Sequence, residues 1–471
     1  MSTVLEPDIC VIGAGSAGLT VAAAASSFGH KVVLIERGEM GGDCLNYGCV
    51  PSKSLIAAAK HAHMARDGAR FGIHAEPRVD YPQVHRHIHN VIASIAPHDS
   101  QERFEGLGVT VLRESARFVD ERTVQAGETL IRARRTVIAT GSRPMVPPIE
   151  GLEDAGFLTN ESVFDLTALP ERLAVIGGGP IGAELAQAFR RLGSRVTVLE
   201  AGPSILSRDD ADAVAVVRAQ MLREGVDIRE NAKVVRVSRE GDARRVHLDG
   251  GGTVVADEVL VAVGRRANVE DLDLGAAGIT THKAGIEVNA GLKTTNPAVF
   301  AIGDVVGGLQ FTHVAGYHGS LAVRAIVFAM PVRFDADLMP RATYTAPELA
   351  QVGPTAAELD ERGEEVTERI ARLSGNDRAQ AEGETEGFVK LLVNRKGRLA
   401  GATIVAPNAG DMIATYALAM AAKVPVKELA SFTPAYPTFA EAGKRAAVTH
   451  FAEKLDKVWI RKVLGVLKRL K

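Results

Sequence analysis

The chain has 471 residues, 46% of them hydrophobic, which predicts about three folded domains and excludes a disordered protein. Its net charge of −2 gives no reason to expect a nucleic-acid partner, and its three cysteines do not make a secreted disulfide framework. No apolar stretch reaches the roughly 20 residues that span a bilayer, and no basic region precedes the first apolar run. A cytoplasmic enzyme is therefore expected.

The first predicted elements are a strand, a glycine turn, a helix and a second strand. In DICVIGAGSAGLTVAAAASSFGHKVVLIE, the apolar run Ile9–Ile12 leads into Gly13, Gly15 and Gly18, and Glu36 ends the second strand. The first two glycines of G-x-G-x-x-G allow backbone N–H groups to approach a pyrophosphate, and the third allows the helix to pack on the strand. A carboxylate at the position of Glu36 can accept hydrogen bonds from ribose hydroxyls.

Two of the three cysteines lie in the short segment GGDCLNYGCVPSK. Zinc needs about four ligands and only Cys44 and Cys49 are local, and a structural bridge is disfavoured in a reducing compartment, so a catalytic role is expected. Residues five apart in a regular helix have Cα atoms about 8.7 Å apart, whereas a disulfide needs about 4.4–6.8 Å. A bridge here requires a distorted segment, which Gly48 and Pro51 permit. Lys53 adds a positive charge that favours a thiolate.

Two further features have plainer interpretations. Cys10 lies inside the first predicted strand and is expected to be a buried core residue. In YPQVHRHIHN, His85 and His89 are four apart and could share a helix face with a metal ion. A solvated histidine-rich helix, which also carries His87, is the favoured interpretation, and no metal site is expected.

The strand–glycine–helix pattern returns in RLAVIGGGPIGAELAQAFRRLGSRVTVLE. Here the glycines are Gly177, Gly179 and Gly182, and Glu200 ends the strand, 23 positions after the first glycine as in the first copy. One glycine motif is weak support, but two copies in the same context indicate two dinucleotide sites.

Three more apolar strands, at 134–144, 257–268 and 294–308, fit the same two units. The last ends at Asp304, where doubly wound sheets place ligand contacts, although an ordinary turn also explains a carboxylate there. From residue 342 the pattern becomes α+β, with two strands around a turn at 387–405 and a helix at 409–423. The charged stretch 361–387 is expected to be mostly a solvated face and loop.

The segment GGDCLNYGCVPSK closely resembles the redox-active segment of the class I pyridine nucleotide–disulfide oxidoreductases, which include dihydrolipoamide dehydrogenase, glutathione reductase and mercuric reductase. The resemblance extends through both glycine motifs, ATGSRP, FAIGD and TYTAPELAQVG. It implies an α/β fold with two Rossmann-type dinucleotide-binding domains and a C-terminal α+β dimerisation domain. The implied boundaries are 1–150 with 270–338 for the FAD domain, 151–269 for the NAD(P) domain and 339–450 for the dimerisation domain.

The resemblance also implies the cofactors FAD and NAD, and the residues that contact them. The implied FAD contacts are Gly13, Gly15, Gly18, Glu36, Lys53, Ala116, Thr140, Gly141, Ser142, Asp304, Gln310, Phe311, Thr312 and His313. The implied nicotinamide-cofactor contacts are Gly177, Gly179, Gly182, Glu200 and Gly264. NAD is expected in preference to NADP because a carboxylate at Glu200 binds a free ribose 2′-hydroxyl and repels a 2′-phosphate.

In the chemistry that the resemblance implies, Cys49 lies against the flavin as the charge-transfer thiol and Cys44 faces the substrate as the exchanging thiol. Lys53 pairs with Glu184 beside the flavin, where its charge stabilises reduced flavin. Hydride passes from nicotinamide to flavin, and the electron pair leaves through the disulfide. The expected function is that of a homodimeric oxidoreductase, closest to dihydrolipoamide dehydrogenase, with a disulfide-type acceptor.

The chain departs from that pattern near its C-terminus, where the family's His–Glu proton shuttle becomes Tyr436 and Glu441 in SFTPAYPTFAEAGKRAA. Tyrosine has a reference pKa near 10 against about 6.5 for histidine, so it is a poor base at neutral pH and dihydrolipoamide oxidation should be slow. A packed aromatic residue is the alternative interpretation. Tyrosine here resembles the mercuric reductase branch, yet no cysteine follows Cys49. A metal ion, a quinone or a protein therefore stay open as acceptors.

The final segment, 451–471, is the one strong charge asymmetry in the sequence. From Lys454 to Lys471 it contains seven basic residues and one acidic residue, with apolar residues at helical spacing. Such a basic amphipathic helix can lie on an anionic membrane or dock on a partner, and a membrane-associated redox partner protein is the alternative from another functional class. A helix packed on the chain's own third domain is the plainer interpretation.

Overall fold

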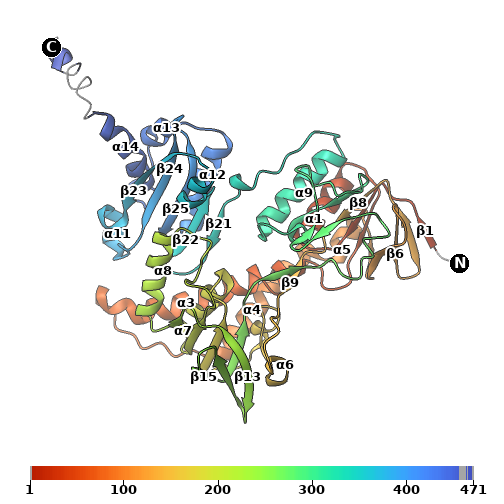
Figure 1. Ribbon diagram of the computed structural model, residues 1–471, viewed down its shortest axis with the longest axis horizontal. Coiled ribbons are helices and arrows are strands. Elements are labelled where there is room, and N and C mark those ends of the chain that lie inside the picture. The colour runs from red at the N-terminus through yellow and green to blue at the C-terminus, as the bar shows by residue number, and fades with distance from the viewer. Residues whose placement is uncertain (1–2, 456–462, 464, 469–471) are drawn as a thin grey trace. The chain divides into compact units, whose positions relative to one another are not determined.

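The computed structural model describes every residue except 1–2, 456–462, 464 and 469–471, so most of the predicted basic tail lies outside the described residues (Figure 1). The chain folds into two compact units. The first comprises Met1–Ala201 and Ala232–Asp335, and the second Gly202–Asn231 and Ala336–Lys471.

The first unit contains a parallel sheet in the order β20-β8-β2-β3-β4. The side chains of its central strand β2 point alternately to the two faces of the sheet. Ile9 and Val11 lie in a core shared with α1 and α9, whereas Cys10 and Ile12 lie in a core shared with a second sheet, β1-β7-β6-β5. The prediction that Cys10 is a buried core residue is confirmed. The bounds are β1 Thr3–Leu5, β2 Ile9–Ile12, α1 Ser16–Ser27, β3 Val32–Ile35, β4 Thr110–Leu112, β5 Ala116–Phe118, β6 Thr123–Ala126, β7 Thr129–Arg132, β8 Arg135–Ile138, β20 Val299–Ala301 and α9 Thr312–Ile326.

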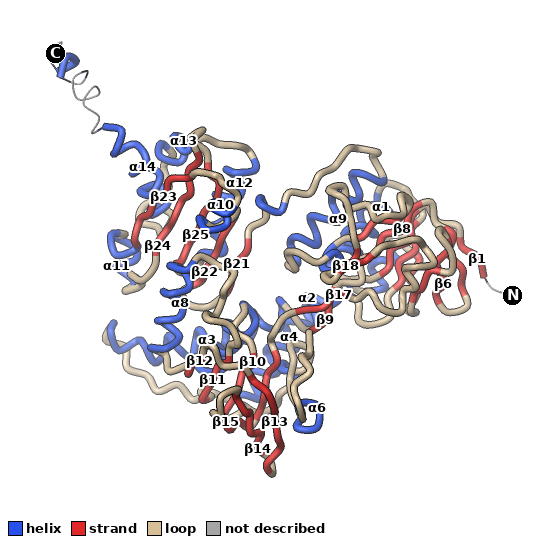
Figure 2. Tube along the Cα trace, in the orientation of Figure 1, coloured by secondary structure: helices blue, strands red, loops and turns tan. Residues whose placement is uncertain are grey.

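The same plan is repeated later in this unit, where β11, β10 and β16 form parallel neighbours and α7 connects β10 to β11. A three-stranded antiparallel sheet, β13-β14-β15, packs its apolar residues against this sheet, as the β5–β7 strands do in the first copy. Two Rossmann-type halves are therefore present (Figure 2). The bounds are β10 Arg172–Ile176, α7 Pro180–Leu192, β11 Arg195–Leu199, β13 Val234–Glu240, β14 Ala243–Leu248, β15 Thr253–Ala256 and β16 Glu258–Val261.

Helices and short strands connect the two halves. Helix α3 packs against α7 of the second half and against α4, and the strands β9 and β17 pair in antiparallel fashion. The bounds are α2 Gly42–Asn46, α3 Cys49–Asp67, α4 Tyr81–Ile95, α5 Gln101–Gly106, β9 Ser142–Pro144, α6 Leu152–Ala155, β17 Arg265–Ala267, β18 Thr281–His282, β19 Gly285–Ile286 and the 3-10 turn η4 Gly303–Val306.

The second unit is built on an antiparallel sheet in the order β21-β22-β25-β24-β23. Its residues from Ala336 onward form the C-terminal α+β domain, and Gly202–Asn231 add α8 and β12. Helix α12 packs on β22 and β25, and α14 packs on β23 and β24. The bounds are α8 Ala211–Arg223, β12 Asp227–Arg229, β21 Arg341–Thr343, β22 Glu348–Val352, α10 Ala356–Glu361, β23 Val366–Arg372, α11 Asp377–Glu382, β24 Phe388–Asn394, β25 Leu399–Ala406, α12 Ala409–Ala421, α13 Val426–Ser431 and α14 Glu441–Leu455.

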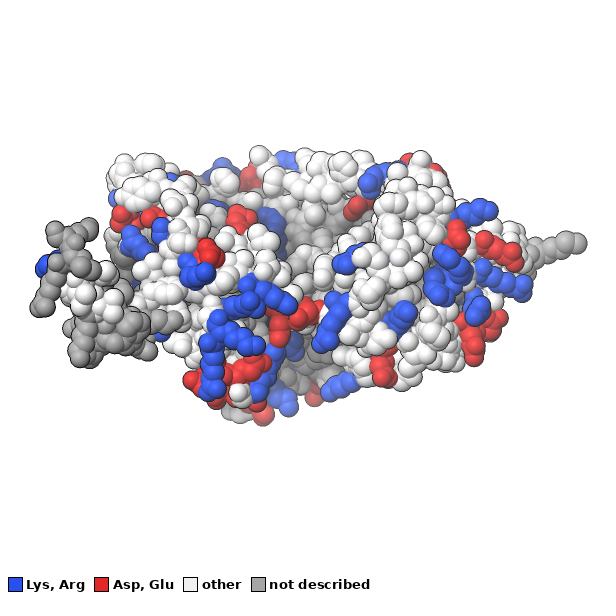
Figure 3. Space-filling model, turned by 90° about the horizontal axis from the view of Figure 1, so that it is seen from above, with Lys and Arg blue, Asp and Glu red and all other residues white. Residues whose placement is uncertain are grey.

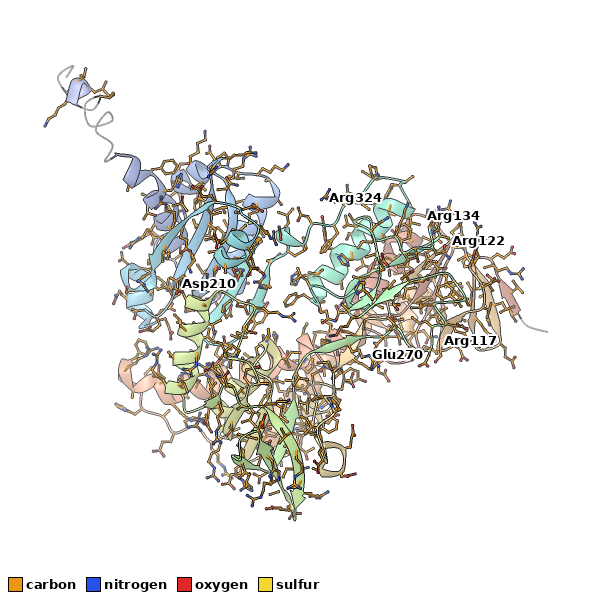
Figure 4. All side chains as sticks on the ribbon, viewed as in Figure 1. Arg117, Arg122, Arg134, Asp210, Glu270 and Arg324 are labelled. Carbon is orange, nitrogen blue, oxygen red and sulfur yellow. The ribbon has the colours of Figure 1, made fainter. Side chains whose placement is uncertain are left out.

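One buried ion pair anchors α8 to this sheet. Lys390 on β24 is 3% exposed and donates to both carboxylate oxygens of Asp210, at 2.8 and 3.0 Å. Asp210, labelled in Figure 4, also caps the start of α8 through the N–H groups of Asp212 and Ala213. A lysine this deeply buried needs such a partner to remain charged.

The charged stretch 361–387 differs in part from its prediction. The sequence predicts mostly a solvated face and loop here. Most of the stretch does face solvent, but it also contains strand β23 and helix α11. Because β23 is an edge strand, it carries charged, exposed side chains such as Glu368 and Arg372, and this polarity conceals its strand period.

No helix in the described part of the chain is long and apolar enough to cross a membrane. On the face drawn in Figure 3, basic and acidic side chains lie interspersed, as the small net charge leads one to expect.

Candidate active site

The first glycine turn has two glycines that the fold requires and one that it does not. A Cβ on Gly13 would lie 2.4 Å from the carbonyl oxygen of Ala139, and a Cβ on Gly18 would lie 1.9 Å from that of Gly13. A Cβ on Gly15 would meet nothing within 4 Å. Gly15 is the N-cap of α1 and provides no side-chain cap, so the helix N-terminus is open to an anion.

The second turn repeats this pattern residue for residue. A Cβ on Gly177 would lie 2.5 Å from the carbonyl oxygen of Ala262 and one on Gly182 would lie 2.0 Å from that of Gly177, but Gly179 again has open space. Gly179 is the uncapped N-cap of α7. The bare backbone at both middle glycines fits the close approach of a dinucleotide pyrophosphate, so the residues present suit two dinucleotides.

The acidic residues after the two strands bind the glycine loops themselves. Glu36 accepts hydrogen bonds from the N–H groups of Ala14, at 2.6 Å, and Gly38, at 2.7 Å. Glu200 accepts from the N–H of Gly178 at 2.7 Å. Each carboxylate has about four acceptor positions, so these bonds leave capacity for a ribose hydroxyl. Contact with a ribose remains a prediction for both residues.

The two cysteines lie on either side of a helix break. Cys44 belongs to α2, which ends at Asn46, and Cys49 is the first residue of α3. Gly48 forms the break, where a Cβ would lie 2.8 Å from Asp43 Oδ2, so only glycine fits without displacing that carboxylate. The segment is therefore distorted as the disulfide argument requires, and both thiols are free in this structure.

The two thiols have opposite pKa shifts. The hydrogen bond from the Cys44 thiol lowers the pKa of Cys49 to about 6, with further help from Thr312 and the charge of Lys53. The same bond, together with burial, raises the pKa of Cys44. The pair therefore shares one proton, with Cys49 as the thiolate. Cys49 Sγ lies 3.1 Å from Thr312 Oγ1 at the start of α9.

Lys53 and Glu184 come together as the resemblance implies. Lys53 Nζ donates to Glu184 Oε2 at 2.8 Å, and the carboxylate side chain is only 7% exposed. Lys53 lies one turn after Cys49 on α3, and Glu184 lies on α7, so the pair joins the cysteine helix to the second glycine motif.

Asp304 follows β20 at the carboxyl edge of the first sheet, in the turn η4. It accepts a hydrogen bond from Ser142 Oγ at 2.7 Å, and burial raises the pKa of its carboxyl group. Arg265 Nε lies 3.9 Å from Asp304 and donates to Ser142 at 2.7 Å. Sequence reasoning did not single out Arg265, because an arginine after a strand carries no signal of what it contacts.

The other predicted cofactor residues lie on the same unit. Thr140 and Asn268 exchange two hydrogen bonds, at 2.7 and 2.9 Å, and the ring of His313 stacks on Phe311 at the start of α9. The remaining members are Gln310 before α9, Ala116 on β5, Gly141 in a left-handed turn, and Gly264, whose carbonyl accepts from the N–H of Met145. Their contacts to FAD or NAD remain predictions.

Tyr436 and Glu441 lie in the second unit. The hydroxyl of Tyr436 donates to Asp377 Oδ2 at 3.0 Å, and this bond raises the pKa of the phenol. Tyr436 is 69% exposed in the single chain, so it does not pack into the core of this subunit, and a role as a packed aromatic residue in the dimer stays a prediction. Glu441 begins α14, and its buried Oε2 has no hydrogen-bond partner among the described residues.

The histidine-rich helix is α4. The rings of His85 and His89 lie 4.2 Å apart, and His89 Nε2 is 3.9 Å from Asp165. Within the residues that the structure describes, no group of three or more His, Cys, Asp or Glu side chains is arranged to hold a metal ion.

Comparisons with known proteins agree with this architecture. The chain is 38% identical over 460 residues to a mercuric reductase of Acidithiobacillus ferrooxidans, covering 94% of this chain and 82% of that protein. It is 35% identical over 453 residues to a dihydrolipoyl dehydrogenase of Geobacillus stearothermophilus, covering 94% and 96%. The structure of LpdA from Mycobacterium tuberculosis matches with a TM-score of 0.88 and 27% identity, covering 95% and 99%.

Two family models also match. Residues 7–319 match the pyridine nucleotide-disulphide oxidoreductase model, and residues 339–447 match the dimerisation domain of the same family. Together with the two dinucleotide cradles and the thiol pair, these matches show that the chain belongs to the pyridine nucleotide-disulphide oxidoreductases, enzymes that use FAD and a pyridine nucleotide.

Proposed function

We propose that this protein oxidises NADH and passes the electron pair through Cys44 and Cys49 to a disulfide-type acceptor. The observation that carries the proposal is the thiol pair itself, in which a helix break, a shared proton and a nearby lysine make Cys49 a thiolate near neutral pH. FAD and the nicotinamide, when bound, supply hydride and electron-pair transfer between the two dinucleotide sites.

The chain's own residues bind and orient the two cofactors. The turn with Gly15 at the start of α1 would hold the FAD pyrophosphate, and the turn with Gly179 at the start of α7 would hold that of NADH. The ammonium group of Lys53, fixed by Glu184, provides a positive charge next to the cysteine helix.

The thiols then carry out the exchange. With both reduced, Cys44 passes the shared proton to Cys49, and the Cys44 thiolate attacks one sulfur of the acceptor disulfide. The other acceptor sulfur leaves as a thiolate and takes up a proton from solvent. Cys49 next attacks the sulfur of Cys44 in the mixed disulfide. The second acceptor sulfur leaves as a thiolate and takes up the proton that Cys49 loses, and Cys44 and Cys49 are joined as a disulfide. Two electrons have moved to the acceptor, which is now a dithiol.

NADH is proposed as the donor because of Glu200 and the residues that follow it. The carboxylate is held at the glycine loop by Gly178, where it would repel a 2′-phosphate. The sequence after it, AGPSILSR, has no basic residue until Arg208. Comparing kcat/KM for NADH and NADPH tests this choice, and a preference for NADPH would overturn it.

Tyr436 favours reduction of an acceptor over oxidation of a dithiol. Its phenol donates its one O–H to Asp377 and is kept protonated by that carboxylate, so it cannot accept a proton near neutral pH. The matched dimerisation domain supports a homodimer, which sedimentation of the purified protein would test.

A second candidate acceptor is a soft metal ion. It is favoured by Tyr436 and by the names of several relatives, which are mercuric reductases, and thiolates are the ligands that soft metals select. The chain lacks a cysteine after Cys49, so Cys44 and Cys49 would have to bind the ion unaided.

A panel of acceptors separates the two candidates. NADH consumption is followed anaerobically with a small disulfide, lipoamide, mercuric and cupric ions, and a quinone, for the wild type and Cys44→Ser. The proposal requires that the wild type reduce a disulfide faster than any other acceptor in the panel. It also requires that Cys44→Ser abolish disulfide reduction. Faster reduction of a metal ion would support the second candidate, and fast quinone reduction that survives Cys44→Ser would contradict both.

A further inference from the structure

Arg265 is a nearly buried arginine that joins four separate segments of the first unit. Its side chain is 10% exposed, and it follows the second half's sheet at the start of β17. It donates to Ser142 twice, through Nε to Oγ at 2.7 Å and through Nη2 to the carbonyl at 2.8 Å. It also donates to Asn160 Oδ1 at 3.5 Å, and its charge faces two carboxylates, Asp43 and Asp304.

The contact with Asp43 leads directly to the thiols. Arg265 Nη2 lies 3.0 Å from Asp43 Oδ1, and Asp43 immediately precedes Cys44 on α2. Asn160 holds the same turn from a second side, because its Nδ2 donates to Asp43 Oδ1 at 3.1 Å and to the carbonyl of Tyr47 at 3.2 Å. Arg265 and Asn160 therefore hold the turn between the two cysteines through an ion pair and two hydrogen bonds.

The charge of Asp43 acts against thiolate formation. Negative charge on Asp43 raises the pKa of both Cys44 and Cys49, whereas Thr312 and Lys53 favour the Cys49 thiolate. A carboxylate next to a redox thiol is unfavourable unless a cation neutralises it. Arg265 is that cation, since it is the residue that the structure places in an ion pair with Asp43.

We propose that Arg265 is a positioning residue for the thiol pair, which fixes the Cys44 turn through Asp43 and neutralises the charge that would otherwise hold the thiols protonated. The proposal rests on the redox role proposed for Cys44 and Cys49. Through Ser142 and Asp304, the same guanidinium also ties this turn to the carboxyl edge of the first sheet, where the flavin is expected.

The test compares thiol titration in four variants of the reduced holoenzyme: Arg265→Gln, Arg265→Lys, Asp43→Asn and the double variant Arg265→Gln/Asp43→Asn. The pH dependence of alkylation is measured, and mass spectrometry of the labelled peptide identifies which cysteine has reacted. Arg143→Gln is the matched control, because Arg143 lies on the paired strand β9 but binds Glu270 and Asn268 instead.

Arg265→Gln should raise the pKa of Cys49 by about 0.5 to 1 unit, the size of one unscreened charge several ångströms away in a partly solvated site. Arg265→Lys keeps the positive charge, so the pKa of Cys49 should stay close to its wild-type value. Adding Asp43→Asn to Arg265→Gln should remove the increase in the pKa of Cys49. Arg143→Gln should leave the titration unchanged. A purely structural role would not be rescued by removing Asp43.

The proposal is overturned if Arg265→Gln, with FAD bound, titrates like the wild type, or if the double variant keeps the raised pKa. If Arg265→Gln does not fold, the Asp43→Asn variant tests the proposal, which requires that this variant lower the pKa of Cys49. Absence of any Cys49 titration below the ordinary thiol range in the wild type would instead contradict the proposed redox role of Cys49.

Discussion

Glu184 accepts a hydrogen bond from Lys53 over 2.8 Å and so couples the helix that begins at Cys49 to the helix that follows the second glycine turn. Because Glu184 is only 7% exposed, it holds the ammonium group in one place. If the flavin binds beside it, as the proposed function requires, this fixed positive charge would stabilise negative charge that develops on the flavin, since it does not have to reorganise during the reaction.

Replacing Lys53 by methionine should therefore slow flavin reduction by NADH about 10²-fold, the effect of losing one preorganised charge. Stopped-flow absorbance under anaerobic conditions measures the rate. Lys60→Met is the control, because Lys60 lies on the same helix with an exposed side chain. Equal rates for both variants would contradict the role given to Lys53.

The glycine turns predict two different kinds of failure. Gly179→Ala should fold normally, since its Cβ meets open space, but should raise the KM for NADH without loss of FAD. Gly177→Ala should fold poorly, because its φ of +106° and a contact of 2.5 Å to Ala262 oppose any side chain.

Thermal melts, FAD content and KM measured together distinguish these outcomes. Gly275→Ala, at a glycine outside both motifs where a Cβ also meets nothing, provides the baseline. If Gly179→Ala binds NADH as tightly as Gly275→Ala, the second cradle is not a cofactor site.

The pKa of Cys49 predicts a pH profile. Since its folded-state pKa of about 6 lies below the ordinary value of 9.0, the thiolate's contribution to stability is fully present above pH 9 and is lost as the pH falls through 6. In the reduced enzyme, thiolate absorbance should therefore appear as the pH rises through about 6. Cys49→Ser should abolish this step, whereas Cys10→Ala should not, because burial raises the pKa of Cys10 to about 12.

Tyr436→His should restore a base to the family's proton shuttle and increase dihydrolipoamide oxidation, by about 10²-fold or more if the imidazole is well placed. Tyr436→Phe should give no such gain, because phenylalanine cannot accept a proton. Steady-state lipoamide assays compare the three proteins. An unchanged rate in Tyr436→His would mean that the slow step lies elsewhere.

Much of the fold could be predicted from the sequence because its signals are local. Apolar runs ending in glycines locate β2 and β10, and the 23-residue spacing to Glu36 and Glu200 locates the second strand of each motif. The cysteine spacing likewise implied a distorted segment, which Gly48 supplies. The edge strand β23 was missed because its exposed charges resemble a loop.

The polar contacts around the thiols could not be predicted in the same way. Asp43, Asn160 and Arg265 are far apart in the chain and are brought together only by the tertiary structure. The bonds from Glu36 and Glu200 to their own glycine loops also depend on side-chain geometry that spacing does not reveal.

The most direct test of the account is an anaerobic titration of the purified yellow enzyme with NADH, in the wild type, Cys44→Ser and Cys49→Ser. We predict a long-wavelength thiolate–flavin absorption band in the wild type and in Cys44→Ser, and no such band in Cys49→Ser, because Cys49 is the thiolate of the pair. An unchanged band in Cys49→Ser, or a protein that purifies colourless and takes up no flavin, would contradict it.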